Sequence, residues 1–257
     1  MQGTPFFDDV MRQAWAGGLR VPLFFPALSS ITAVFTAASA EARRLLPDTR
    51  MRPVEVAPGR CLLTVAAIEY RESDLGAYNE VAIALPIAFG GMAPPAFDAL
   101  FRGAGKALSA YVWQLPVTTR AAYDAGVDLA GFPKSLAEIA FHREGRQLRC
   151  TLGPPDAPVL SLVCDSREPD DRARVRDRQL KLRNYTLKEG HVLVSNFVLR
   201  QKHFDDHFRR DAARLELGQG AIAQSLRALQ LSERPIASQS CQDAEAMLFA
   251  PRNVIDD

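Results

Sequence analysis

Residues 60–89 read RCLLTVAAIEYRESDLGAYNEVAIALPIAF, and this stretch decides the class of fold. Two apolar runs, 60–70 and 79–89, have the length and the β-branched content of strands. The polar residues between them include Gly76, which marks a turn. Because so short a connection joins antiparallel strands, the two runs predict neighbouring strands of a sheet.

Strand-like runs recur along the rest of the 257 residues, and short connections again make them mostly antiparallel. Helical patterns are fewer and lie between these runs. Three or four peripheral helices and at least eight strands indicate one mainly β domain over 1–257, with an irregular N-terminal arm at 1–28. Strands are predicted at 30–36, 108–117, 136–142, 146–153, 158–164, 185–187, 191–200 and 213–217, and helices at 39–46, 118–130 and 221–230.

Composition excludes several classes of function. The net charge is +1 with interspersed signs, and no basic stripe carries the aromatic residues typical of nucleic-acid binding. No apolar run approaches the ~20 residues of a membrane span. The first fifteen residues lack the basic-then-apolar order of a secretion signal. We therefore expect a cytoplasmic protein without nucleic-acid or membrane partners.

The metal-ligating residue types do not form a recognisable motif. The four cysteines are far apart in sequence, which suggests neither a zinc site nor a disulfide framework. His203 and His207 have the spacing of a metal-binding helix, but the glutamate of H-E-x-x-H is missing and a strand precedes them. No metal is predicted.

Lys134 is the residue with the most unusual local setting. A helix capped by Thr118 or Thr119 is predicted to end at Gly131, and Pro133 then stiffens the turn that carries the lysine. The spacing of the helix places on one face the residues Ala122, Ala125, Gly126, Leu129 and Ala130. The flanking apolar residues should lower its pKa, because they disfavour the charged amine. A neutral amine is a nucleophile. The alternative is a turn lysine whose ammonium group reaches water.

The scarcity of lysine in this chain strengthens the case for Lys134 as the nucleophile. Only five of the 31 basic residues are lysines, and arginine stays charged and does not form a Schiff base. Glu80 is the second candidate, because it opens an otherwise apolar strand and a carboxylate is rarely buried without a partner. A solvated strand end is the alternative for Glu80. The charge-dense segment 167–183 predicts a solvated loop or strand edge, with an anionic-substrate funnel as the alternative.

Two motifs resemble the acetoacetate decarboxylase superfamily. DLGAYNEVAIALPIAF at 74–89 is followed at 125–139 by AGVDLAGFPKSLAEI, in the order and at about the spacing of that family. The resemblance implies a closed antiparallel β-barrel or cone with peripheral helices. It further implies a pocket without a cofactor, a small keto acid or ketone as substrate, and assembly into homo-oligomers, dimers or larger.

The resemblance also implies roles for individual residues. Lys134, after Phe132-Pro133, would form the Schiff base, and Glu80 would be the acid or base beside it. Acetoacetate decarboxylase is itself a well-known example of an enzyme with an activated lysine, so a nucleophilic amine with a lowered pKa is a property of the family. Tyr78 and Phe132 would line the substrate pocket.

Two departures from the family pattern concern charge. The decarboxylases carry a second lysine where this chain has Ser135, which we expect to donate a hydrogen bond to substrate or to cap a turn. They also carry a substrate-binding arginine that would align near Leu28, where this chain has none; Arg20 is the nearest upstream candidate. Superfamily members with aldol or dehydration chemistry are therefore alternatives to a decarboxylase.

Three functions remain open from the sequence. The first is a carbon–carbon lyase that forms an iminium between Lys134 and a ketone or β-keto acid. The second is a non-enzymatic barrel that binds an apolar ligand. The third is hydrolysis by water that Glu80 activates, which predicts that turnover survives Lys134→Arg.

Overall fold

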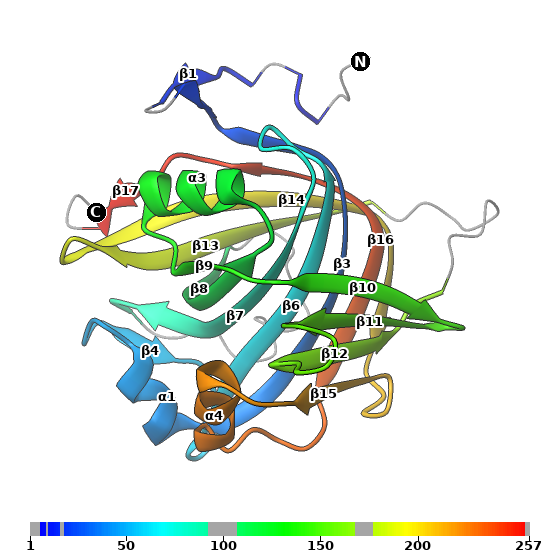
Figure 1. Ribbon diagram of the computed structural model, residues 1–257. Coiled ribbons are helices and arrows are strands. Elements are labelled where there is room, and N and C mark those ends of the chain that lie inside the picture. The colour runs from blue at the N-terminus through cyan, green and yellow to red at the C-terminus, as the bar shows by residue number, and fades with distance from the viewer. Residues whose placement is uncertain (1–5, 9, 16–17, 92–106, 168–176, 255–257) are drawn as a thin grey trace.

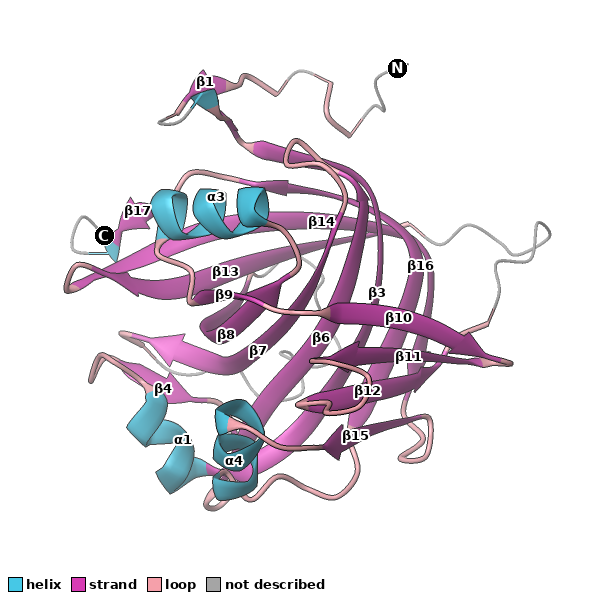
Figure 2. Ribbon diagram, viewed as in Figure 1, coloured by secondary structure: helices cyan, strands magenta, loops and turns pink. Residues whose placement is uncertain are grey.

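The computed structural model describes all residues except 1–5, 9, 16–17, 92–106, 168–176 and 255–257. Strands dominate it, with three α-helices among the described residues (Figures 1 and 2). The helices are α1 (Ser39–Leu45), α3 (Arg120–Ala130) and α4 (Ala221–Ala228). The strands are β1 (Gln13–Ala14), β2 (Arg20–Val21), β3 (Leu23–Ala38), β4 (Met51–Pro53), β5 (Glu55–Ala57), β6 (Arg60–Glu72), β7 (Tyr78–Phe89), β8 (Leu108–Val117), β9 (Lys134–Leu136), β10 (Ile139–Glu144), β11 (Gln147–Leu152), β12 (Leu160–Asp165), β13 (Arg178–Lys188), β14 (His191–His207), β15 (Ala213–Leu217), β16 (Ala237–Leu248) and β17 (Arg252–Asn253).

The predicted closed barrel is confirmed. Its strands follow the order β7-β6-β3-β16-β14-β13-β8, and β8 pairs with β7 to close the ring. Neighbouring strands are antiparallel except β13 and β8, which run parallel. Closure satisfies the backbone groups that an open sheet would leave at its edges.

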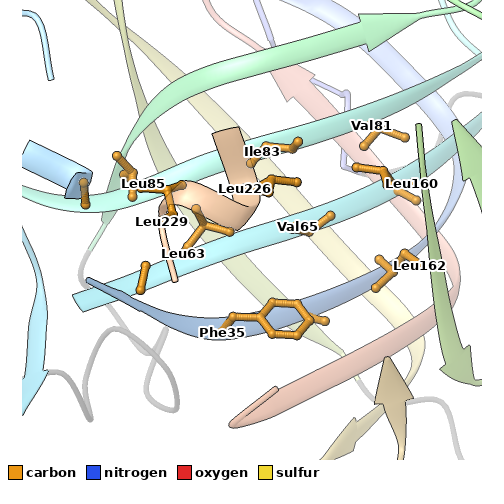
Figure 3. Packing of buried hydrophobic residues seen from close by; sticks show 14 of the residues in the cluster. Phe35, Leu63, Val65, Val81, Ile83, Leu85, Leu160, Leu162, Leu226 and Leu229 are labelled. Atoms are coloured by element: carbon orange, nitrogen blue, oxygen red, sulfur yellow. The ribbon is translucent and has the colours of Figure 1, made fainter. Parts of the chain in front are cut away.

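A second sheet covers part of the outer face of the barrel. Its strands β10, β11, β12 and β15 are antiparallel and lie in front of β6 and β3 in Figure 1. Helix α4 lies below this sheet, and Leu226 of this helix and Leu229 just after it pack against the barrel (Figure 3). The main core therefore lies outside the barrel, between its wall and these elements.

Alternation along the barrel strands explains where this core sits. In β6, Leu63, Val65 and Ala67 are fully buried in the outer core. The intervening Thr64 and Ala66 line a cavity inside the barrel. Successive side chains of a strand point to opposite faces, so the large residues fill the outer core while smaller ones leave space within.

Several boundaries differ from the sequence prediction. Strand β3 begins at Leu23 and includes Pro26, so the predicted arm at 1–28 ends earlier than expected. Pro26 is accommodated beside a register shift between Ala27 and Leu28. The predicted strand 136–142 is divided between β9 and β10, because the chain there passes from the barrel to the second sheet.

Other differences concern polar strands. Residues 178–183, predicted within a charged loop or strand edge, begin the barrel strand β13, while 168–176 lie outside the described residues. His203 and His207 belong to β14, so they do not share a helical face. Strand β3 continues directly into α1, so the N-cap of that helix is Ala38, the last residue of the strand. Among the described residues, none of the helices is long and apolar enough to cross a membrane.

Candidate active site

Helix α3 and the turn after it position Lys134. The side-chain oxygen of Thr119 caps the helix by accepting a hydrogen bond from the amide of Ala122. Gly131 ends it with φ 60°, a left-handed conformation that glycine adopts without strain. These observations confirm the predicted helix. Its buried face consists of the predicted residues Ala122, Ala125, Gly126, Leu129 and Ala130.

Lys134 begins β9, which pairs in parallel with β8 and places Lys134 opposite Leu115. From there its side chain runs across the buried face of α3 at Gly126. A Cβ atom at position 126 would lie 2.6 Å from Cδ of Lys134. The lysine therefore reaches the interior because position 126 has no side chain. Only 5% of the Lys134 side chain is exposed.

Glu80 meets the amine inside the barrel. Its Oε2 lies 2.7 Å from Nζ of Lys134, and its side chain is 7% exposed. Its other oxygen, Oε1, accepts a hydrogen bond of 3.2 Å from the hydroxyl of Tyr70. A buried charge is tolerated when it is paired and hydrogen-bonded, and both oxygens of Glu80 meet this condition.

Two stacked tyrosines flank the pair. Tyr70 and Tyr78 face each other across β6 and β7, with ring centroids 4.5 Å apart. The ring centroid of Tyr78 lies 5.6 Å from Nζ of Lys134. Burial, and then the charge of Glu80, hold the pKa of both phenols well above the usual range. Both phenols are therefore protonated at neutral pH, and Tyr70 is a hydrogen-bond donor.

The pair opens into a cavity of about 440 Å³. Tyr78 and Phe132, two of the predicted site residues, line it beside Lys134 and Glu80, and most of the remaining wall is apolar. Among the described residues, its only other charged lining groups are Arg178 and Asp206. A volume of this size is in the range of small-molecule pockets.

Two sequence-predicted residues lie elsewhere. Ser135 is exposed and is absent from the cavity lining, because it follows Lys134 in a strand and points to the opposite face. Arg20 is exposed in β2, and it too lies outside the lining. The structure thus brings neither residue to the cavity. No described group of three or more His, Cys, Asp or Glu is arranged to hold a metal ion.

Two functional candidates escape the sequence reasoning. The sequence marks Tyr70 only as the end of a strand. Tyr70 and Tyr78 are, however, the residues directly before and after the connection 71–77, and in a hairpin such residues are opposite each other. It marks Gly126 only as part of the apolar helix face. The close approach of Gly126 to Lys134 has no local signal, because it depends on where β9 crosses the helix.

Comparison with known proteins bears on this arrangement. The sequence model of the acetoacetate decarboxylase family matches residues 11–250, which is nearly the whole chain. The chain belongs to the acetoacetate decarboxylase family. Among curated protein sequences, no significant match was found.

Solved structures place the fold in the same family. One from structural studies of acetoacetate decarboxylase has a TM-score of 0.61 and 17% identity, covering 92% of this chain and 90% of its own. The acetoacetate decarboxylase of Legionella pneumophila subsp. pneumophila str. Philadelphia 1 has a TM-score of 0.60 and 15% identity, covering 95% and 89%. At such identities the likeness concerns the acetoacetate decarboxylase fold.

A third structure is the enduracididine biosynthesis enzyme MppR complexed with the condensation product of pyruvate and imidazole 4-carboxaldehyde. Its TM-score is 0.56 at 14% identity, over 97% of this chain and 93% of its own. The acetoacetate decarboxylase fold therefore also occurs in a protein that binds the product of a condensation.

Proposed function

We propose that this acetoacetate decarboxylase family member is a carbon–carbon lyase that forms a Schiff base between Lys134 and a ketone or β-keto acid. The observation that carries the proposal is the 2.7 Å contact of Nζ of Lys134 with Glu80 in a largely apolar cavity. A lysine that is desolvated beside a proton acceptor is an activated nucleophile.

The proposed reaction begins with transfer of a proton from Lys134 to Glu80. The neutral amine then adds to the carbonyl carbon of the substrate, and one amine proton passes to the oxygen that becomes the carbinol hydroxyl. Glu80 returns its proton to that hydroxyl, which leaves as water. The products are an iminium and a carboxylate, so the paired charges of the resting site are restored.

The iminium then withdraws electrons from the neighbouring carbon. From a β-keto acid, the carbon–carbon bond to the carboxylate breaks, carbon dioxide leaves, and an enamine forms. From a ketone with an α-hydrogen, transfer of that proton to the carboxylate of Glu80 also gives an enamine, which can attack an aldehyde in an aldol addition. Protonation of the enamine carbon, or its addition to the aldehyde, restores an iminium, and hydrolysis of that iminium releases the product and regenerates the amine of Lys134.

The distribution of charge favours the aldol or dehydration branch. Among the described residues, the cavity wall contains one cation besides Lys134, and that cation, Arg178, is already paired with Asp206. A small β-keto acid would thus lack an unpaired cation for its carboxylate. The condensation product bound by the neighbour MppR supports the same branch.

Reductive trapping tests the proposal. The protein is incubated with 2-butanone, acetoacetate or pyruvate, reduced with borohydride, digested, and mapped by mass spectrometry. We expect a mass increment on the peptide that contains Lys134, and none in Lys134→Arg, which keeps the charge but does not form the imine. Absence of an adduct at Lys134 with each of a broad set of ketones and keto acids would refute the mechanism.

The largely apolar cavity also favours a second candidate, a barrel that binds an apolar ligand without reaction. In that case Lys134 serves as a point charge for a carboxylate head group. Binding of a fatty acid, measured by calorimetry, would then survive in Lys134→Arg and fall in Lys134→Met, while borohydride would trap nothing.

Assembly into a homo-oligomer is part of the proposal, on the basis of the family. Light scattering after gel filtration measures the mass of the particle, which we expect to be a multiple of the 28.3 kDa of one chain. A single 28.3 kDa species at micromolar concentration would contradict this expectation.

A further inference from the structure

The cavity continues well beyond the Lys134–Glu80 pair. Its wall on β3, β6 and β7 carries small side chains at successive inward positions, among them Thr32, Ala66 and Ala82. These three residues are opposite one another across the strands, so they form one row across the wall. A small substrate bound at Lys134 would leave this row without contact.

The strand register gives the length of that row. Gln239 of β16 pairs with Thr32, Thr32 pairs with Ala66, and Ala66 pairs with Ala82. With ~4.8 Å between neighbouring strands, Gln239 lies ~14 Å along the wall from Ala82. Glu80 is two residues farther along β7, which adds ~7 Å along the strand. Because these two displacements are perpendicular, Glu80 at one end of the cavity and Gln239 at the other are about 16 Å apart along the wall.

Four polar side chains occupy the far end, and we call them the polar ring: Arg178, Gln201, Asp206 and Gln239. Arg178 donates to Asp206 at 2.9 and 3.1 Å and to the side-chain oxygen of Gln201 at 2.8 and 3.0 Å. Gln201 donates to Gln239, and Gln239 donates to Asp206, each at 2.5 Å. The hydrogen bonds thus form a closed circuit on the cavity wall.

The polar ring has no net charge. The guanidinium of Arg178 and the carboxylate of Asp206 are paired in a bidentate contact, and the two glutamines are neutral. Among the described residues of this end, a charged group would find no unpaired counter-ion. A hydroxyl or carbonyl group can exchange hydrogen bonds with the glutamine amides at little electrostatic cost.

We infer that the substrate is a ketone with an extended apolar chain that ends in a neutral hydroxyl or carbonyl group. The carbonyl carbon at the head lies at Lys134, the chain lies along Thr32, Ala66 and Ala82, and the tail binds at the polar ring. Allowing for the reach of the side chains at both ends, about 10 Å remains, which a chain of about eight to ten carbon atoms covers at ~1.2 Å per bond. The inference rests on the proposed imine chemistry for its head group, and on the cavity alone for its chain and tail.

The test compares 2-butanone, 2-decanone and 10-hydroxy-2-decanone. Half-saturating concentrations are measured by borohydride trapping in the wild-type protein, and dissociation constants by calorimetry in Lys134→Met, which binds without reacting. Each buried methylene strengthens binding by about fourfold at full burial. We expect 2-decanone to bind at least ~100-fold more tightly than 2-butanone, and the hydroxyl tail to preserve or improve that affinity.

Two variants test separately the contacts of the apolar chain and those of the polar tail. Thr32→Leu narrows the row and should weaken 2-decanone at least ~10-fold more than 2-butanone. Gln239→Leu breaks the polar ring and should weaken 10-hydroxy-2-decanone relative to 2-decanone, reversing or abolishing their order of affinity. Thermal unfolding of each variant establishes that it is folded.

The outcomes distinguish this inference from the proposed function. Equal affinity for short and long ketones, or equal effects of Thr32→Leu on both, would overturn the inference even if Lys134 is trapped. Unchanged preference for the hydroxyl tail in Gln239→Leu would overturn the tail contact. If no ketone is trapped in the wild type while Lys134→Met still binds 2-decanone tightly, the imine chemistry fails and the assignment of the cavity to a long chain is supported.

Discussion

Gly126 of α3 and Lys134 of β9 pack so closely that a methyl group at position 126 would overlap the end of the lysine side chain. The nearest atoms are Cε and Cδ of Lys134, which are flexible, so the lysine and not the helix would move. The absence of a side chain at Gly126 thus fixes the path by which the amine reaches Glu80.

Gly126→Ala is therefore predicted to impair imine formation without unfolding the protein. Alanine favours a helix interior by roughly 1 kcal/mol over glycine, and this gain offsets part of the cost of weakening the buried Lys134–Glu80 pair. Displacement of Nζ from Glu80 should slow borohydride trapping at least ~10-fold. Gly91→Ala is the matched control, since the nearest contact of a Cβ there is at 4.0 Å. Unchanged trapping in Gly126→Ala would contradict the role of this close approach.

The Lys134–Glu80 ion pair predicts strong coupling between two substitutions. With both side chains nearly buried, Lys134→Met alone leaves an uncompensated carboxylate and should lower the free energy of unfolding by about 3–5 kcal/mol. Adding Glu80→Leu removes that carboxylate and should recover most of the loss. Urea unfolding of the wild type, both single variants and the double variant gives the coupling energy. Additive effects would show that the two groups do not interact energetically.

Tyr70→Phe removes the hydroxyl that donates to Oε1 of Glu80 and keeps the stacked ring. A hydrogen bond to a charged group contributes about 1.5–3 kcal/mol, so we expect imine formation to slow by about tenfold or more. Single-turnover trapping with a fixed ketone measures the rate. Tyr111→Phe is the control, because it removes a tyrosine hydroxyl from a partly buried residue of β8. Equal rates in both variants would argue that Tyr70 only packs against Tyr78.

The helix and the central strands could be predicted because their signals are local. Thr119 caps α3 and Gly131 ends it, and the apolar runs of β6 and β7 are interrupted only at their turn. Strand β16 could not be recognised, since its Ser and Gln residues resemble a loop. Of these polar residues, Ser238 and Gln239 line the cavity, where Gln239 belongs to the polar ring.

The candidate site was predictable only in part, because it depends on residues far apart in sequence and on the strand face that each one occupies. Lys134 and Glu80 are 54 residues apart, and the family resemblance, not the local sequence, brought them together. Ser135 lies outside the cavity although its neighbour Lys134 lines it, because strand alternation turns Ser135 outward. Arg178 lies in a charge-dense segment and shares the cavity face of β13 with Leu180 and Leu182, at every second position. This spacing can be interpreted only once β13 is placed in the barrel.

Alkaline pH provides a test of the buried tyrosine pair. The pKa of Tyr70 and of Tyr78 is raised in the folded protein, chiefly by burial, so the folded state retains phenolic protons that the unfolded chain releases. Their contribution to stability is complete below the unfolded value of ~10 and is lost as pH rises toward the folded pKa. Above pH ~10, each phenol should lower the free energy of unfolding by about 1.4 kcal/mol per pH unit.

Buried thiols add to the same trend from a lower pH. Burial raises the pKa of Cys150 from 9.0 to about 12, so stability should begin to fall near pH ~9. Urea unfolding between pH ~8 and pH ~11.5 measures the slope in the wild type, in Cys150→Ala and in Tyr70→Phe. We expect Cys150→Ala to reduce the slope from pH ~9 upward and Tyr70→Phe to reduce it only above pH ~10. A slope in Tyr70→Phe that equals the wild-type slope above pH ~10 would mean that this phenol gives up its proton as readily in the barrel as in the unfolded chain.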